Sequence, residues 1–81
     1  MINLEIETKL SAEEAYKRVK SFFGKGGLNL DIVEETEACL KFTGGGGYVN
    51  ATICEAGDKH RIELISQEWE PQVKRFASDI K

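Results

Sequence analysis

Apolar and polar residues alternate along several stretches of this chain, which is the pattern of strands in an amphipathic sheet. Ile2, Leu4 and Ile6 alternate with polar side chains and predict a first strand with one buried face. The same alternation recurs in four later stretches, residues 28–35, 38–42, 49–53 and 61–64. The pattern therefore predicts five strands, and a turn near Thr36 separates the second from the third.

A helix is predicted directly after the first strand. Ser11 with Glu14 three residues later has the spacing of a capping box, and apolar residues then recur at helical spacing as far as Phe23. The glycines of "GKGG", residues 24–27, end this helix, because glycine readily adopts the left-handed conformation that turns the chain.

A second helix is predicted over the last residues of the sequence. Apolar residues recur at helical spacing from Trp69 to Ile80, and Pro71 suits the first turn, where its missing N–H is harmless. The order of elements is therefore β-α-β-β-β-β-α. In 81 residues this order predicts one α+β domain, residues 1–81, with a five-stranded antiparallel sheet and both helices packed on one face.

The run "TGGGGYV", residues 43–49, predicts a tight hairpin turn. With Gly45 and Gly46 at its centre, a type I′ turn sets the apolar residues of both flanking strands on one face. The facing pairs are Phe42 with Val49, Leu40 with Ala51, and Ala38 with Ile53. A phosphate-binding loop is disfavoured, because such loops lead into a helix and these glycines lead into a strand. The turn leaves Gly44 and Gly47 unexplained, and close passage of a helix or of a partner would account for them.

This order of elements resembles the TATA-box-binding-protein-like fold, which the helix-grip domains of the Bet v 1 and START type share in elaborated form. The resemblance covers the whole chain and consists of element order alone, so it carries over no functional residue. Helix-grip proteins hold lipophilic ligands beneath a long C-terminal helix, whereas the last helix here has about twelve residues and bulky aromatic side chains fill the space. The TATA-binding protein applies its open sheet face to DNA, and here that face carries several carboxylates.

Charge and composition narrow the classes of partner and compartment. The net charge of −3 disfavours a general affinity for nucleic-acid backbones. The basic end of the first helix is explained by the helix dipole and consists of Lys17, Arg18, Lys20 and Lys25. No apolar run approaches the roughly 18 residues of a membrane span, and the first residues lack a signal-peptide pattern. Cys39 and Cys54 form no metal-binding motif and are expected as reduced thiols. We therefore expect a cytoplasmic protein without a metal or cofactor.

The predicted register places a set of amphipathic residues on the helix-free face of the sheet. Cys39 lies beside Thr52, and Cys54 lies between Glu37 and Arg61. The two thiols are diagonal neighbours, too far apart for a disulfide without backbone movement. The candidate interaction face consists of Val33, Cys39, Lys41, Tyr48, Asn50, Cys54, Arg61 and Ile65.

No group of residues predicts a catalytic centre, so we expect a protein that is not an enzyme. His60 has no nucleophile beside it and is expected to be solvated at the start of the last strand. A thiol beside an arginine would have a lowered pKa, but a small residue that tolerates a sheet surface explains Cys54 more simply. The carboxylates of Glu34, Glu35 and Glu37 are expected to be hydrated at a hairpin.

The leading functional hypothesis is association with protein partners, through the open sheet face or an edge strand, with self-association included. An alternative, implied by the helix-grip resemblance, is the binding of a small apolar ligand between sheet and helices. Nucleic-acid binding through Lys41, Arg61 and Tyr48 is a third and less favoured hypothesis.

Overall fold

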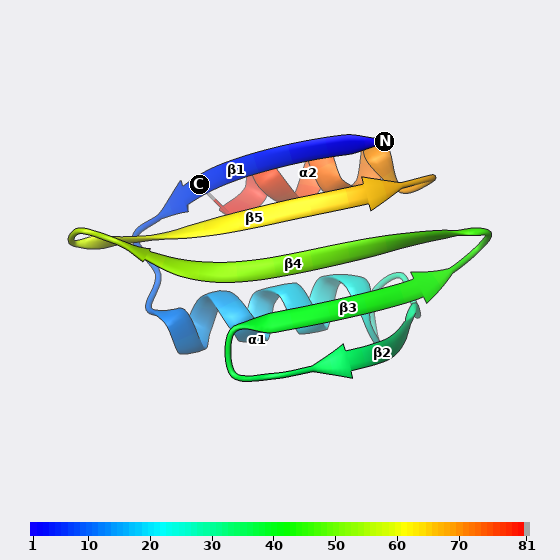
Figure 1. Ribbon diagram of the computed structural model, residues 1–81, viewed down its shortest axis with the longest axis horizontal. Helices are drawn as coiled ribbons and strands as arrows, with labels where there is room; N and C mark the ends of the chain where they lie inside the picture. The colour runs from blue at the N-terminus through cyan, green and yellow to red at the C-terminus, as the bar shows by residue number, and fades with distance from the viewer. Residues whose placement is uncertain (81) are drawn as a thin grey trace.

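The computed structural model describes residues 1–80 as one five-stranded antiparallel sheet and two helices. The elements are β1 (Ile2–Thr8), α1 (Ala12–Phe23), β2 (Asp31–Glu35), β3 (Cys39–Gly44), β4 (Gly47–Ala56), β5 (Lys59–Gln67) and α2 (Glu70–Ile80). The strands lie in the order β1-β5-β4-β3-β2, so that the first strand pairs with the fifth (Figure 1). The predicted α+β class, element order and antiparallel sheet are confirmed.

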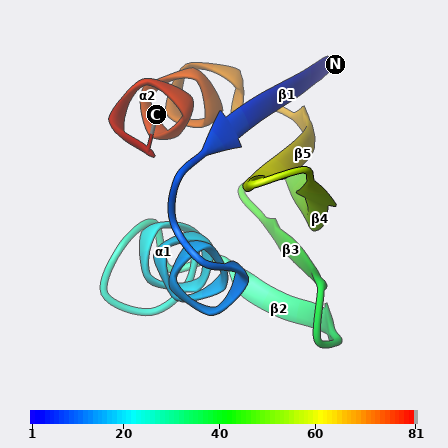
Figure 2. The same cartoon turned by 90° about the vertical axis from the view of Figure 1, so that its left-hand side faces the viewer.

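Both helices cover the same face of the sheet (Figure 2). Helix α1 packs on β3 and β4, and α2 packs on β1 and β5. The opposite face carries no helix and is open to solvent (Figure 2). Within residues 1–80, neither helix has the length and apolar character needed to cross a membrane.

The core lies between the sheet and the helix layer, where a cluster of phenylalanines joins three elements. The ring of Phe23 on α1 lies 5.7 Å from that of Phe42 on β3 and 5.3 Å from that of Phe76 on α2. Phe22 lies 5.2 Å from Phe76, so that α1 and α2 meet through their aromatic side chains. Tilted aromatic pairs at these distances add stability beyond the burial of their surface. The bulky side chains expected to fill this space do so.

Helix α1 begins at the predicted cap, because the backbone N–H of Glu14 donates to Ser11 Oγ at 3.1 Å. It ends at Gly24, whose N–H donates to the carbonyl of Lys20. The prediction that the second strand begins at residue 28 is wrong, since β2 begins at Asp31. Backbone hydrogen bonds to the end of α1 hold residues 27–30 in a compact turn, and this turn takes the place of the first part of the strand.

The hairpin between β3 and β4 has the predicted register. Gly44 faces Gly47, and Phe42 faces Val49. Gly45 and Gly46 have φ angles of 58° and 83°, the left-handed conformation that a type I′ turn requires at both positions. The turn chemistry and the side-chain pattern therefore select the same pairing.

Close packing explains the two outer glycines of this hairpin. A Cβ atom at Gly44 would lie 2.7 Å from a methyl carbon of Leu30, and one at Gly47 would lie 2.1 Å from the carbonyl oxygen of Gln67. The indole N–H of Trp69, directly before α2, donates to the carbonyl of Gly44 at 2.9 Å. The hairpin end is therefore packed against two parts of the chain. A side chain at Gly44 would press on the turn between α1 and β2, and one at Gly47 would press on the end of β5.

Candidate interaction face

The open face of the sheet carries the residues predicted to lie there. Pairing between β3, β4 and β5 places Cys39 beside Thr52, Asn50 beside Ile65 and Lys41 beside Asn50. Val33 belongs to β2 and is the most exposed large apolar side chain of this set, at 63%. The register shifts between Ile32 and Glu34, so Val33 is the extra residue of a β-bulge at the sheet edge.

A row of uncharged side chains follows the central strand across this face. Tyr48, Asn50, Thr52 and Cys54 occupy alternate positions of β4, and each is partly exposed. Their apolar neighbours in the chain, such as Val49 and Ala51, are buried under the helices. Because side chains alternate between the two faces of a strand, the four residues form one continuous uncharged strip at the middle of the sheet.

The cations beside this strip are neutralised by carboxylates on the same face. Lys41 Nζ lies 3.5 Å from Glu34 Oε2, and the guanidinium of Arg61 lies 3.1 Å from Glu63 Oε2. The hydrogen bond from Arg61 to Glu63 raises the pKa of the arginine above its ordinary value. Both positive charges therefore have partners within the chain, which weakens the case for phosphate binding here.

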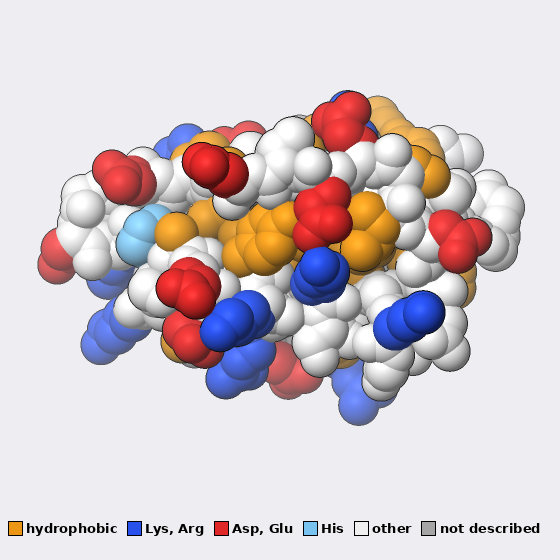
Figure 3. Space-filling model, turned by 90° about the horizontal axis from the view of Figure 1, so that it is seen from below, with side chains coloured by type: hydrophobic (Ala, Val, Ile, Leu, Met, Phe, Trp, Pro, Cys, Tyr) orange, Lys and Arg blue, Asp and Glu red, His pale blue; other side chains and the backbone are white. Residues whose placement is uncertain are grey.

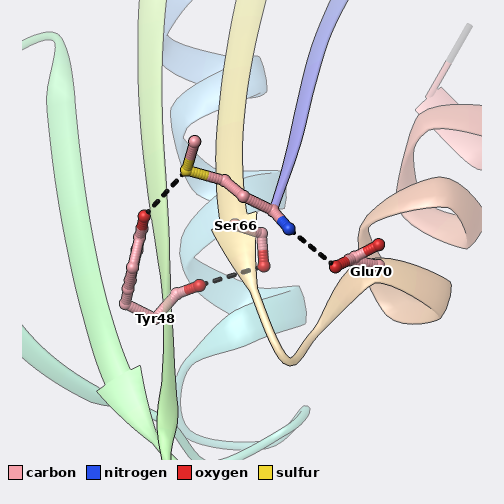
Figure 4. Close-up of polar contacts among 4 residues, drawn as sticks. Tyr48, Ser66 and Glu70 are labelled. Atoms are coloured by element: carbon pink, nitrogen blue, oxygen red, sulfur yellow. Dashed lines mark hydrogen bonds and ion pairs between the residues drawn. The ribbon is translucent and has the colours of Figure 1, made fainter.

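Tyr48 lies at one end of the strip and is linked to the first residue of the chain. Its hydroxyl donates to the sulfur of Met1 at 3.3 Å, and the Met1 side chain crosses β5 to make this contact (Figure 4). Its backbone carbonyl accepts a hydrogen bond of 2.9 Å from the hydroxyl of Ser66, which is fully buried on β5 (Figure 4). The amino group of Met1 lies 3.2 Å from Glu70 on α2. Tyr48 thus presents a half-buried aromatic ring on the open face, with a polar contact to Met1.

The two cysteines are free and half-buried on this face. Thr52 Oγ1 lies 3.9 Å from Cys39 Sγ, and Cys54 Sγ lies 3.9 Å from the carboxylate of Glu63. Cys54 pairs with Arg61 as predicted, but the arginine bonds to Glu63. The guanidinium is thereby engaged by a carboxylate instead of the thiol.

Two details of the predicted surroundings of the strip are wrong. The first is Glu37, which lies outside the sheet because β3 begins only at Cys39, so it is not a strand partner of Cys54.

The second is His60, which is half-buried instead of solvated. Its Nδ1 lies 3.0 Å from the carbonyl of Leu10, and because a carbonyl oxygen only accepts hydrogen bonds, the proton is on Nδ1. The ring therefore ties the start of β5 to the connection between β1 and α1.

Both edge strands of the sheet are charged. All five residues of β2 are exposed, and three of them are acidic. On β1 the side chains of Asn3, Glu5 and Glu7 are exposed. Charges and bulges on edge strands hinder pairing with another chain. The open face is therefore a better candidate for association than either edge.

A polar link between α1 and β2 is the feature that sequence reasoning missed. The carboxylate of Glu35 accepts hydrogen bonds from the Tyr16 hydroxyl at 2.9 Å and from Lys20 Nζ at 2.8 Å. Burial and the Glu35 carboxylate raise the pKa of Tyr16 to about 12, so its hydroxyl stays protonated as a donor. The hydrogen bonds from Lys20 and Tyr16 lower the pKa of Glu35. The bulge at Val33 hid this link, since it shifts Glu35 onto the helix side.

Beside this link, a groove of about 620 Å³ separates α1 from β2. Its lining includes Leu30, Ile32 and Asp31 from the strand side and Lys17, Lys20 and Lys25 from the helix side. Viewed from below, the space-filling surface shows an apolar band between acidic and basic side chains (Figure 3).

Two further searches, for a metal-binding group among the described residues and for similar proteins, found no match. Within residues 1–80, no three histidine, cysteine, aspartate or glutamate side chains are grouped closely enough to hold a metal ion. Neither a protein-family model nor a curated protein sequence matches the chain.

Proposed function

We propose that this protein is a small association domain that binds a protein surface through the open face of its sheet, and that a second copy of the chain is the first partner to test. The observation that carries the proposal is the uncharged strip of Tyr48, Asn50, Thr52 and Cys54 along the central strand. Depletion of charge and enrichment in aromatic residues distinguish the centre of a protein interface from its rim.

The arrangement around the strip supports the same proposal. Charged pairs lie on both sides of it, Lys41 with Glu34 and Arg61 with Glu63, and such pairs suit the polar rim of an interface. Tyr48 has only two side-chain torsions, so an interface would immobilise this aromatic residue at little entropic cost. Two unpaired cysteines suit a reducing compartment, and we propose that the protein acts in the cytoplasm.

The alternative of an apolar ligand between sheet and helices has less support. The rings of Phe23, Phe42 and Phe76 occupy the space in which such a ligand would lie. Nucleic-acid binding through Lys41 and Arg61 is also less supported, because both cations are paired with carboxylates.

The test is the solution mass across a concentration series, measured by light scattering or sedimentation. We expect a concentration-dependent dimer that the substitution Thr52→Arg abolishes, since it introduces a charge at the middle of the strip. Ser78→Arg is the matched control, because Ser78 is exposed on α2 and receives the same charge on the helix layer. A dimer that Thr52→Arg leaves intact would refute the assignment of the face. A strict monomer would redirect the proposal to a different protein partner.

A further inference from the structure

We infer that the groove between α1 and β2 is a binding site for a single-chain amphiphile with an anionic head, such as a fatty acid carboxylate. The groove has an apolar part, Leu30 and Ile32, and a basic rim, Lys17, Lys20 and Lys25. Its volume of about 620 Å³ falls within the range of roughly 300–1,000 Å³ that is typical of small-molecule sites. This site is separate from the open face and does not depend on the proposed association.

Ile32 is the exposed apolar residue of the groove, whereas Leu30 beside it is buried in the core. Ile32 faces Phe42, so it belongs to the face that the helices cover, yet 38% of it remains exposed. Phe42 itself is fully buried. The sheet therefore extends past α1 at β2, and a hydrocarbon chain laid along this border would bury Ile32 and the rim of the core.

The positive charge of the lysine rim favours an anionic head group. Within residues 1–80, Lys25 has no carboxylate at ion-pair distance, and the pair between Lys17 and Glu13 is long and exposed, at 3.5 Å. Lys20 is held by Glu35, and Asp31 is the acidic member of the lining. Two lysines are thus available to an anion, and the stems of lysine side chains pack along a hydrocarbon chain.

A peptide strand is a poorer occupant of the same groove. It would have to pair with the free edge of β2, which is interrupted by the bulge at Val33 and carries Asp31, Glu34 and Glu35. These features oppose strand addition. A hydrocarbon chain requires no backbone pairing, so the bulge does not obstruct it.

The experiment titrates the protein with octanoate, decanoate and decanol, and follows the backbone amides by NMR. We expect saturable binding with shifts concentrated in residues 17–25 and 29–32. Decanoate should bind more tightly than octanoate by up to about fourfold per added methylene, because each buried methylene contributes about that factor. Decanol, which has no negative charge, should bind about tenfold more weakly than decanoate, and raising the salt concentration should reduce this difference.

Two double variants separate the groove from general electrostatics. Lys17→Gln with Lys25→Gln should weaken decanoate binding about tenfold, whereas Lys74→Gln with Arg75→Gln removes the same charge from α2 and should leave binding unchanged. Three results would overturn the inference. They are an equal loss of decanoate affinity in both double variants, equal affinities for decanoate and decanol, and NMR shifts on the open face. Sedimentation with phosphatidylglycerol vesicles in the absence of decanoate binding would also overturn it, in favour of a membrane surface.

Discussion

The four glycines of the β3–β4 hairpin have different roles, and replacing them singly with alanine should show this. Gly47 has no positive φ, but a Cβ atom there would lie 2.1 Å from the carbonyl oxygen of Gln67. Side-chain Cβ atoms do not approach closer than 3.0 Å, so the backbones at Gly47 on β4 and at Gln67, the end of β5, must separate by about 0.9 Å, the difference of these two distances. Gly46 has φ of 83° and no atom within 4 Å of the added Cβ.

The magnitudes follow from these two situations. Forcing extra volume into a packed backbone contact costs about 3 kcal/mol, the upper end of the usual cost of overpacking, so Gly47→Ala should lose that amount. Gly46→Ala suffers only the left-handed conformation, at about 1–2 kcal/mol. Gly46→Asn should lose less than Gly46→Ala, because asparagine tolerates that conformation better than alanine.

Urea unfolding monitored by the fluorescence of Trp69, the single tryptophan, provides the assay. For a domain of this size the free energy of unfolding falls by about 1 kcal/mol per M urea. Gly47→Ala should therefore lower the midpoint by about 3 M, and Gly46→Ala by about 1–2 M. If Gly46→Ala is the more destabilising of the two, packing against Gln67 does not explain the glycine at position 47.

Three further substitutions test individual polar contacts by urea unfolding, followed by circular dichroism. Trp69→Phe removes the hydrogen bond to Gly44 and should cost about 1 kcal/mol, and an unchanged midpoint would show that this bond contributes nothing. Thr8→Val removes a buried donor to the carbonyl of Ile80 and should cost about 1–2 kcal/mol, whereas a neutral effect would mean that water satisfies that carbonyl. The pKa of Glu35 is lowered in the folded state, so its contribution is present above the ordinary carboxyl pKa and is lost as the pH falls through the folded value. Glu35→Gln should therefore destabilise at pH 7 and have little effect near pH 2, and a difference independent of pH would contradict this.

Much of the fold is predictable because local rules agree with one another. The alternation around the glycine turn allows one register only, since a slip of one residue would set the apolar row of Phe42 and Leu40 against the polar row of β4. The cap at Ser11 and the glycine stop at Gly24 fix α1 in the same way. Each of these signals lies within a few residues of the feature that it determines.

The remaining features depend on contacts between distant parts of the chain. The β2 bulge has no glycine or other local marker, and it decides that Glu35 meets Tyr16 and Lys20. The groove beside it results from the relative positions of α1 and the sheet edge, to which no single stretch of sequence corresponds. The uncharged strip was predictable residue by residue, while the contact of Tyr48 with Met1 required the position of β1.

The pairing of the first strand with the fifth has a consequence for the order of folding. Strands β2 to β5 form successive hairpins and pair with close neighbours in sequence, so they assemble with a small loss of chain entropy. Strand β1 pairs with β5 alone and packs under α2, the last element of the structure. During synthesis β1 leaves the ribosome before the other described elements and remains unpaired until β5 has followed. The apolar side of β1 is then the segment most exposed to chaperones or to aggregation.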